Sequence, residues 1–237
     1  MELVVFAGGR GSRCGELTAN RHKGAILFRE QPLIHHVLST FAELKDVTRI
    51  LVITGYQQHT ICEAVASFAK KNAGVCIETI DGPNAIVGTC RRLAYAIPYL
   101  TERNGCIVTG IDVLIHKSAA ESLLRVVRED QCRYRALLLA SQTNIAPTHL
   151  VARIQRGFVS ELRPPVNAQE VGVCRDTGVR YVPQNDFAEI QQQLSVISGD
   201  ISVSRYWATQ MDVKRPIRAI VTYENWRHFA SSDDFIE

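Results

Sequence analysis

The chain reads Leu3-Val4-Val5-Phe6-Ala7-Gly8-Gly9-Arg10-Gly11-Ser12-Arg13 close to its N-terminus, and this stretch decides the fold. An apolar run that stops at paired glycines predicts a buried strand leading into a loop, because glycine adds no side chain and tolerates positive φ. The exposed backbone amides of such a loop form an anion-binding nest. Because basic residues lie within it and Lys23 follows, we interpret the loop as a phosphate cradle. The alternative is a glycine turn with solvated basic residues.

Two other glycine motifs do not fit this loop. A Rossmann dinucleotide turn requires a helix that begins at the glycines, whereas here residues 24–28 intervene and the next helical pattern follows Pro32. A Walker P-loop requires Gly-Lys-Ser/Thr, whereas here Lys23 precedes Gly24 and Ala25 follows. The loop therefore belongs to neither class.

The composition indicates a soluble, cytoplasmic protein that handles small anions. Of the 237 residues 46% are hydrophobic, and the net charge is +3. This small positive balance favours a local anionic ligand over a nucleic-acid surface. The 7 cysteines form no Cys-x-x-Cys pair, which speaks against a disulfide framework or a structural zinc site and indicates a reducing compartment. Because no apolar run approaches membrane-spanning length and no charged leader precedes the first strand, we expect no membrane association.

Apolar runs along the rest of the chain alternate between strand and helix periodicity. Strands are predicted at 49–54, 75–77, 106–115, 135–140 and 217–221, and helices after 32, through 61–68, from 89, through 123–127 and through 187–194. This alternation implies parallel pairing with right-handed crossovers, so ligands gather at the carboxyl ends of the strands. Short alternating pieces at 150–159 predict a hairpin. We therefore expect an α/β fold with a Rossmann-like, mostly parallel sheet flanked by helices and a small β-rich part.

Two positions inside this pattern are candidate ligand contacts. Asp112 is the one carboxylate of the apolar run 106–115. Because buried charges are rarely left unpaired, it is predicted at the carboxyl end of the strand, facing a cation. It is then either a metal ligand, since Mg²⁺ takes one or two carboxylates plus substrate phosphates, or the cap of the helix that begins near Lys117. Gly88-Thr89 opens a helix, which suits capping or a ligand contact.

The opening loop and the residues after it resemble the signature of the nucleotidyltransferase family that includes the sugar-1-phosphate nucleotidylyltransferases (NDP-sugar pyrophosphorylases). In that family a strand leads to Gly-Gly-x-Gly-x-Arg, then to Thr, Pro-Lys and a Pro-Leu-Ile helix start. This chain supplies Gly8 to Arg13, Thr18, Lys23 and Pro32-Leu33-Ile34 in the same order. His22 stands where the family usually has proline. The resemblance spans almost the whole chain and implies a GT-A-like fold in a single domain, 1–237, with a mainly nucleotide-binding half (1–147) and a mainly acceptor-binding half (148–237).

The resemblance also implies which residues of the first half hold the nucleotide and the metal. The family uses the Gly-Thr pair for the base and a strand that ends in Gly-Asp for Mg²⁺, although here Ile111 separates Gly110 from Asp112. The expected catalytic residues are Arg13, Lys23 and Asp112. The expected nucleotide-binding residues are Ala7, Gly8, Gly9, Gly11, Ser12, Gly88 and Thr89.

Three segments of the second half resemble the acceptor and metal sites of the family. Residues 161–164 resemble a Glu-Lys-Pro segment whose lysine contacts the sugar phosphate, and Arg163 keeps that charge. Residues 176–182 resemble Asn-x-Gly-Ile-Tyr, which lines the acceptor pocket, so Arg163 and Gly178 are the expected acceptor contacts. The closing segment 226–235 places His228 where many members have a second metal-binding aspartate, so Asp112 and His228 are the expected metal residues. Because imidazole is a poor ligand for hard Mg²⁺, the alternatives are that Glu224 or a neighbour takes this role, that the metal rests on Asp112 and the nucleotide phosphates alone, or that activity is weakened.

Together these features predict transfer of NMP from an NTP to a sugar 1-phosphate or related phosphate monoester, with release of pyrophosphate. Such an acceptor is ionised near neutral pH, so catalysis needs positioning and charge neutralisation but no general base. The expected partners are an NTP, Mg²⁺ and a phosphorylated small-molecule acceptor; a homo-oligomer is compatible with the sequence. One alternative is a catalytically impaired nucleotide-binding relative with a regulatory or scaffolding role, motivated by His22 and His228. The other is a glycosyltransferase, whose usual Asp-x-Asp pair is missing because Gly110 stands two residues before Asp112.

Overall fold

The computed structural model describes residues 1–83, 88–141, 149–196, 201–211 and 215–236. One sheet with the strand order β5-β4-β1-β6-β11-β8-β12-β10-β9 forms its centre. Its strands are β1 (Glu2–Phe6), β4 (Arg49–Ile53), β5 (Cys76–Ile80), β6 (Cys106–Gly110), β8 (Arg135–Ala140), β9 (Val151–Gln155), β10 (Phe158–Arg163), β11 (Cys174–Val182) and β12 (Ile217–Thr222). The expected boundary between the two halves, at 147–148, lies outside the described residues.

The sheet is mixed, with most of its strands pointing the same way. β5, β4, β1 and β6 pair in parallel, as do β8 and β12. β11 runs antiparallel to β6 and β8, and β10 runs antiparallel to β12 and β9. The predicted α/β fold with a mostly parallel sheet is confirmed, and the predicted hairpin is β9–β10.

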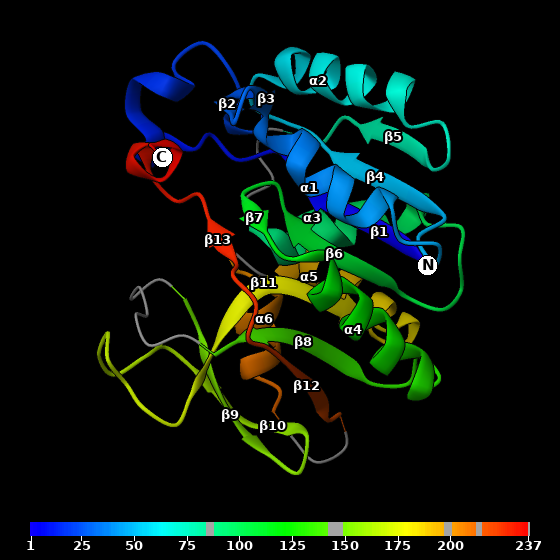
Figure 1. Cartoon of the computed structure of the whole chain (residues 1–237). Helices are drawn as coiled ribbons and strands as arrows, with labels where there is room; N and C mark the ends of the chain where they lie inside the picture. Colours follow the sequence, from blue (N-terminus) through cyan, green and yellow to red (C-terminus); the bar gives the residue numbers. More distant parts are fainter. Residues whose placement is uncertain (84–87, 142–148, 197–200, 212–214, 237) are drawn as a thin grey trace.

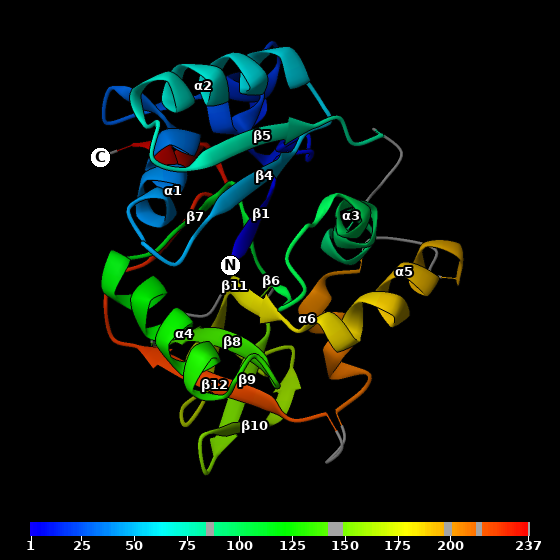
Figure 2. The same cartoon turned by 90° about the vertical axis from the view of Figure 1, so that its right-hand side faces the viewer.

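Helices cover both faces of the sheet (Figures 1 and 2). One core cluster contains residues of α1 (Leu33–Ala42), α2 (Gln58–Lys71) and α4 (Lys117–Glu129), and the other contains residues of α3 (Thr89–Ala96), α5 (Phe187–Val196) and α6 (Val203–Ala208). The helices form because their apolar residues recur at three- and four-residue spacing, as Ile34, Leu38 and Phe41 do in α1. Within the described ranges, no helix has the length and apolar character needed to span a membrane.

The run 106–115, expected to be one strand, is broken into two. β6 ends at Gly110, and the amide of Ile111 still donates to the carbonyl of Phe6 at 3.2 Å. The chain then turns out of the sheet at Asp112, because a carboxylate needs a charged partner that the apolar sheet does not supply. Beyond the turn, β7 (Val113–Leu114) pairs with β13 (Arg227–His228). Asp112 does not cap the next helix; the His116 side chain does, accepting from the amide of Ser118 at 3.4 Å.

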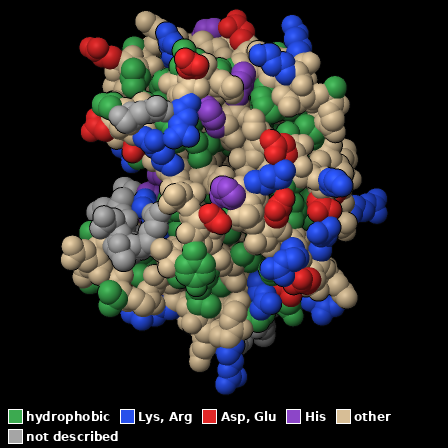
Figure 3. Space-filling view, viewed as in Figure 1, with side chains coloured by type: hydrophobic (Ala, Val, Ile, Leu, Met, Phe, Trp, Pro, Cys, Tyr) green, Lys and Arg blue, Asp and Glu red, His purple; other side chains and the backbone are tan. Residues whose placement is uncertain are grey.

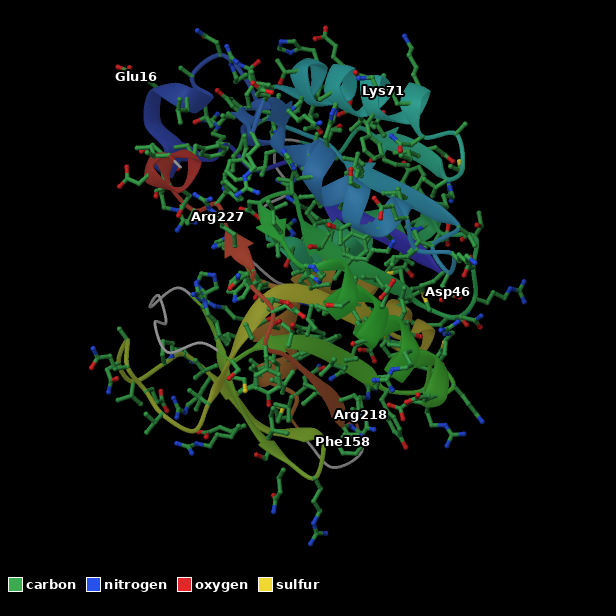
Figure 4. All side chains as sticks on the ribbon, viewed as in Figure 1. Glu16, Asp46, Lys71, Phe158, Arg218 and Arg227 are labelled. Carbon is green, nitrogen blue, oxygen red and sulfur yellow. The ribbon has the colours of Figure 1, made fainter. Side chains whose placement is uncertain are left out.

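Two arginines, Arg218 and Arg227, connect strands of the C-terminal part of the chain to neighbouring segments (Figure 4). The guanidinium of Arg218 on β12 lies over the ring of Phe158 on β10, 4.9 Å from the ring centroid. Arg227 on β13 donates to the carbonyl of Ile236 at 3.2 Å. Just before that residue, the short helix η5 (Ser232–Phe235) lies against η1 (Ser12–Thr18), which follows the glycine loop (Figure 1). The end of the chain therefore returns to the loop near its beginning.

His22 braces the turn that carries Lys23, the short helix η2 (Lys23–Ala25). Its ring Nδ1 accepts a hydrogen bond from the amide of Gly24 at 3.0 Å, and its own amide donates to the hydroxyl of Thr60 at 3.0 Å. His22 is 1% exposed. Burial and the neighbouring Lys23 lower the pKa of His22 to about 4, so the ring is neutral at physiological pH.

The close packing of this turn predicts the effect of adding one methyl group. A Cβ on Gly24 would lie 2.0 Å from Cδ1 of Ile111 and 2.8 Å from Cδ1 of Ile61. We expect Gly24→Ala to lower the free energy of unfolding by about 1–3 kcal/mol through overpacking. Gly74→Ala is the matched control, because a Cβ there meets no atom within 4 Å. Urea denaturation checks both variants, and equal midpoints would contradict the expectation.

The low pKa of His22 predicts an acid-dependent loss of stability. Between pH 6.5 and about 4 the unfolded chain binds a proton at His22 that the folded chain does not, so stability falls as the pH falls through this window. Since His22→Asn removes the titration, wild type should lose up to about 3 kcal/mol more than this variant across the window. Urea denaturation at each pH measures the difference. His59→Asn, at an exposed histidine, is the control and should keep the pH dependence of the wild type.

Candidate active site

A cleft of about 320 Å³ opens where β1 and β6 end and β11 passes them. Figure 3 shows the surface indented on the side where these strands end. The cleft is lined by Phe6, Arg13, Thr89, Gly110, Asp112, Val113, His149, Leu150, Asp176, Thr177, Gly178, Arg180, Ser202, Arg205 and His228. Residues from both halves of the sequence therefore meet at the edge of the sheet where ligands were expected.

Five residues predicted from the sequence line the cleft: Arg13, Thr89, Asp112, Gly178 and His228. A sixth predicted residue, Lys23, does not line the cleft but contacts Asp112, which does. The Lys23 ammonium donates to Oδ2 of Asp112 at 2.9 Å and to the carbonyl of Phe229 at 2.7 Å. The cation that Asp112 faces is thus Lys23, which is only 6% exposed.

The charge state of Asp112 follows from these neighbours. Burial by itself would raise the pKa of Asp112, but Lys23 and His228 hold it well below its usual range. The backbone of Asp112 is fixed as well, because its carbonyl accepts from the amide of Phe229 at 2.9 Å. An ionised carboxylate is therefore held at the cleft over the whole physiological pH range.

The glycine loop leaves no room for side chains at two of its positions. A Cβ on Gly8 would lie 1.5 Å from Nη1 of Arg92, whose Nη2 donates to the Gly8 carbonyl at 2.9 Å. Gly11 has φ +64°, and a Cβ there would lie 3.2 Å from the Lys23 side chain. Gly9, in contrast, has open space around it. The loop is thus packed against Arg92 and Lys23 while its middle stays accessible.

Thr89 joins α3 to α6 and does not cap its own helix. The N-cap of α3 is Gly88, with φ +85° and no side-chain hydrogen bond. The hydroxyl of Thr89 accepts from the amide of Val203 at 3.2 Å, and Ser202, at the N-cap of α6, accepts from the amide of Arg205 at 3.2 Å. Ser202 and Arg205 reach the cleft because α6 is fixed to the start of α3 in this way.

β11 contributes a turn around Gly178 to the opposite wall. Gly178 has φ +90°, and its amide donates to Oδ1 of Asp176 at 2.9 Å. Oδ2 of Asp176 lies 3.4 Å from Nη2 of Arg180, and both side chains are buried. The negative charge of Asp176 and the positive charge of Arg180 therefore compensate each other. The ladder between β11 and β8 shifts register between the two residues, and both line the cleft.

His228 lies beside Asp112, as the closing segment predicted. Its Nε2 is 3.4 Å from Oδ2 of Asp112, and its Nδ1 is 3.1 Å from Nε2 of His149. Burial and Arg175 lower the pKa of His149 to about 4. Sequence reasoning assigned no role to His149, Ser202 or Arg205, because residues of these types carry no spacing signal on their own. Asp176 and Arg180 had one signal, their place in the segment around Gly178.

Several predicted site residues are not among those that line the cleft: Ala7, Gly8, Gly9, Gly11, Ser12, Gly88 and Arg163. Of these, Arg163 is paired with acidic side chains. Its Nε donates to Glu161 at 2.7 Å, and its Nη1 donates to Glu170 at 3.0 Å. Glu170 also accepts from the amide of Val166 at 2.9 Å. Arg163 is not among the residues that line the cleft. Its placement therefore gives no support to the expected contact with an acceptor phosphate.

The cleft fits a metal ion only if the substrate supplies most of the ligands. Among the described residues, no group of three or more His, Cys, Asp or Glu side chains is placed to hold one. Oδ2 of Asp112 is occupied by Lys23 and His228, whereas Oδ1 accepts no hydrogen bond from the part of the chain described. A single carboxylate oxygen can hold a hard cation such as Mg²⁺ when substrate phosphates complete its coordination shell.

Solved structures share this fold at low sequence identity. The inositol-1-phosphate CTP transferase from T. maritima matches with a TM-score of 0.80 at 17% identity, covering 98% of this chain and 90% of that one. UDP-glucose pyrophosphorylase complexed with UDP-glucose matches with a TM-score of 0.79 at 14% identity, covering 99% and 95%. At such identities the similarity establishes the fold.

Sequence comparison identifies the family. The curated bifunctional protein GlmU of Francisella tularensis subsp. novicida is 25% identical over 171 residues, 72% of this chain and 34% of GlmU. The chain thus matches about a third of the length of the curated relatives. The sequence profile described as nucleotidyl transferase matches residues 2–154. The chain therefore belongs to the nucleotidyl transferase family, a family of enzymes, and the resemblance inferred from its glycine motif is confirmed.

Proposed function

We propose that this protein transfers NMP from an NTP to a sugar 1-phosphate or a related phosphate monoester and releases pyrophosphate. The observation that carries this proposal is the Lys23–Asp112 pair, 2.9 Å apart, held at the cleft between the glycine loop and β11. The pair brings a cation and an ionised carboxylate to the place where the loop would present a triphosphate. Two of the similar structures are an inositol-1-phosphate CTP transferase and a UDP-glucose pyrophosphorylase, and their names support the proposal.

The triphosphate would be bound by the loop and by charges that face the cleft. The accessible middle of the loop offers backbone amides around Gly9, and Arg13 lines the cleft beside them. Among the described residues, no carboxylate pairs with Arg13, so its charge is available to phosphate oxygens. The ammonium of Lys23, hydrogen-bonded to Asp112, adds positive electrostatic potential at the cleft. Thr89, at the start of α3, marks the expected side for the base.

Asp112 would hold Mg²⁺ together with the nucleotide phosphates. When bound, the metal supplies positive charge that neutralises the phosphate oxygens as charge builds up on pyrophosphate. The chain's own contribution is to keep Asp112 ionised and oriented. Lys23 does so by donating to Oδ2, and Oδ1 accepts no hydrogen bond from the described residues.

The reaction that these groups permit is an in-line displacement. An oxygen of the acceptor phosphate forms a bond to the α-phosphorus of the NTP, the bond from that phosphorus to the bridging oxygen breaks, and the electron pair leaves with pyrophosphate. The nucleophile is already ionised, so no side chain has to remove a proton. This agrees with the low pKa values of Asp112 and His149, which make a carboxylate and a neutral ring the ordinary states there.

We assign the acceptor phosphate to Arg205. It is exposed and lines the cleft, and no described carboxylate pairs with it. The arginines of β11, across the cleft, have partners: Arg180 faces Asp176, and Arg175 faces His149. Because Arg163 is held by two glutamates outside the cleft, Arg205 is the better candidate.

The metal role of Asp112 predicts a large loss of activity in Asp112→Asn. We expect pyrophosphate release to fall by roughly 100-fold or more, since one charged group at the reacting phosphates is worth about this much, with NTP affinity measured without a divalent metal within about threefold of wild type. The assay screens common NTPs against sugar 1-phosphates with Mg²⁺. Asp233→Asn, at an exposed carboxylate, is the control. If wild type binds nucleotide but releases no pyrophosphate with any pair, the regulatory, catalytically impaired alternative is correct.

The assignment of Arg205 predicts a selective change in acceptor binding. Arg205→Gln should raise KM for the acceptor by about 10- to 100-fold, the value of a charge-assisted hydrogen bond, and leave KM for the NTP within about twofold. Arg163→Gln is the matched comparison and should leave both constants nearly unchanged. Steady-state kinetics with each substrate varied in turn separates the two arginines. The reverse pattern would restore the acceptor contact to Arg163.

A further inference from the structure

Three neighbouring strands are each followed by a glycine at the edge of the sheet where the cleft opens. β1, β4 and β5 are parallel, and their last residues are in register. Gly8, Gly55 and Gly82 each stand two residues beyond a strand end. A Cβ on Gly55 would lie 2.9 Å from Cα of Gly8, and one on Gly82 would lie 2.8 Å from the carbonyl oxygen of Thr54. The three loops therefore pack backbone against backbone, which only residues without a side chain allow.

Arg92 lies at the Gly8 end of this row of loops. Its Nη2 donates to the carbonyl oxygen of Gly8 at 2.9 Å, a contact between residues 84 apart in the chain. A Cβ on Gly8 would lie 1.5 Å from Nη1 of Arg92, so the guanidinium occupies the place that a side chain at this position would need. Arg92 is 8% exposed and is not among the residues that line the cleft. Its position therefore suits a support for the loop better than a direct contact with a substrate.

The bond from Arg92 sets the direction of the next amide. The peptide group between Gly8 and Gly9 is trans, and in a planar trans peptide the C=O and N–H bonds point in opposite directions. Because the Gly8 carbonyl points toward Arg92, the Gly9 amide points away from it. Gly9 is exposed, with open space where a side chain would lie, and no described residue accepts from its amide. Such an amide is available to an anion.

The helix that carries Arg92 is itself fixed at its N-terminus. The amide of Cys90 donates to the carbonyl of Ile201 at 3.1 Å, and the hydroxyl of Thr89 accepts from the amide of Val203 at 3.2 Å. The start of α3 is thereby joined to the start of α6. Arg92 follows within one turn of these contacts, so its guanidinium reaches the loop from a backbone that is held in place.

We propose that Arg92 is a positioning residue for the glycine loop, and that the amide it directs, that of Gly9, binds a phosphate of the NTP. Glycine has more backbone freedom to lose than any other residue. Holding the Gly8 carbonyl in the free protein removes part of this entropic cost from nucleotide binding, because the loop is already arranged for the phosphate. The ligand of the loop is the triphosphate of the proposed function, on which this inference rests.

The Gly9 amide can be observed without turnover. In the full chain with ¹⁵N-labelled glycine, we expect its proton resonance to shift downfield on titration with Mg²⁺ and a non-hydrolysable analogue of whichever common NTP wild type binds most tightly. Gly9→Ala identifies the resonance, and Gly74, in the turn before β5, should not shift. In Arg92→Met the shift should fall to less than half. No shift at Gly9 in wild type, or an equal shift in Arg92→Met, would overturn the proposal.

Affinity separates support of the loop from a general effect of charge. The Kd of the same analogue should rise by about 10-fold or more in Arg92→Met, the value of one hydrogen bond to a charged group. Arg92→Lys keeps a donor and the charge and should recover most of this loss. Arg91→Met is the matched control: it removes the same charge from the next position of α3, where Nε has no partner among the described residues, and Kd should stay within about twofold. Equal losses in the two Met variants would overturn the proposal.

The pyrophosphate assay adds a further check. In Arg92→Met, KM for the NTP should rise by about 10-fold and kcat should stay within about threefold, since a contact made equally to bound NTP and to the transition state does not change kcat. A fall in kcat at unchanged KM would contradict the positioning role. Circular dichroism confirms the fold of each variant, and the wild-type shift at Gly9 tests the proposal even if Arg92→Met does not fold. A wild-type chain that shows this shift but releases no pyrophosphate would remove the proposed function and keep the role of Arg92.

Discussion

The position of the cleft depends on one partly buried ion pair, Lys23–Asp112. Lys23 is 6% exposed, and a charged ammonium that is removed from water is costly unless an anion and further acceptors surround it. Asp112 and the carbonyl of Phe229 meet that need at 2.9 and 2.7 Å. The pair thereby joins the turn after the glycine loop, the end of β6 and the segment after β13. Three distant parts of the chain are held at one edge of the sheet.

The order of the strands determines which segment lies across the cleft from the Lys23–Asp112 pair. β1 and β6 are parallel neighbours, so the glycine loop and Asp112 leave the sheet at the same edge. β11 is placed next to β6 but runs the other way, which brings the turn at Gly178 to that edge from the opposite direction. The nucleotide side and the proposed acceptor side therefore come together without a linker between separate domains, because one continuous sheet carries both.

The two histidines that depart from the family pattern have different physical roles. His22 is buried and neutral, and it holds the turn of Lys23 through a hydrogen bond with the amide of Gly24. His228 lies between two polar groups, with its Nδ1 3.1 Å from Nε2 of His149 and its Nε2 3.4 Å from Oδ2 of Asp112. The two rings therefore differ in their neighbours: His22 contacts the backbone of a turn, and His228 contacts a carboxylate. Thr60, which contacts His22, is 38 residues away in the chain, and His149, which contacts His228, is 79 residues away.

The sequence by itself determined the α/β class, the glycine loop, the order of strands and helices along the chain, and the place of Asp112 at the end of a buried strand. These features follow from local periodicity, glycine and a lone carboxylate in an apolar run, all of which a short window contains. Only the tertiary structure decided that Lys23 is the cation facing Asp112, that Arg163 is held by glutamates away from the cleft, and that His149 and Arg205 line it. The physical reason is that a charge pairs with whichever partner the fold brings within about 4 Å, and strand order and register fix that distance in ways that no local pattern contains.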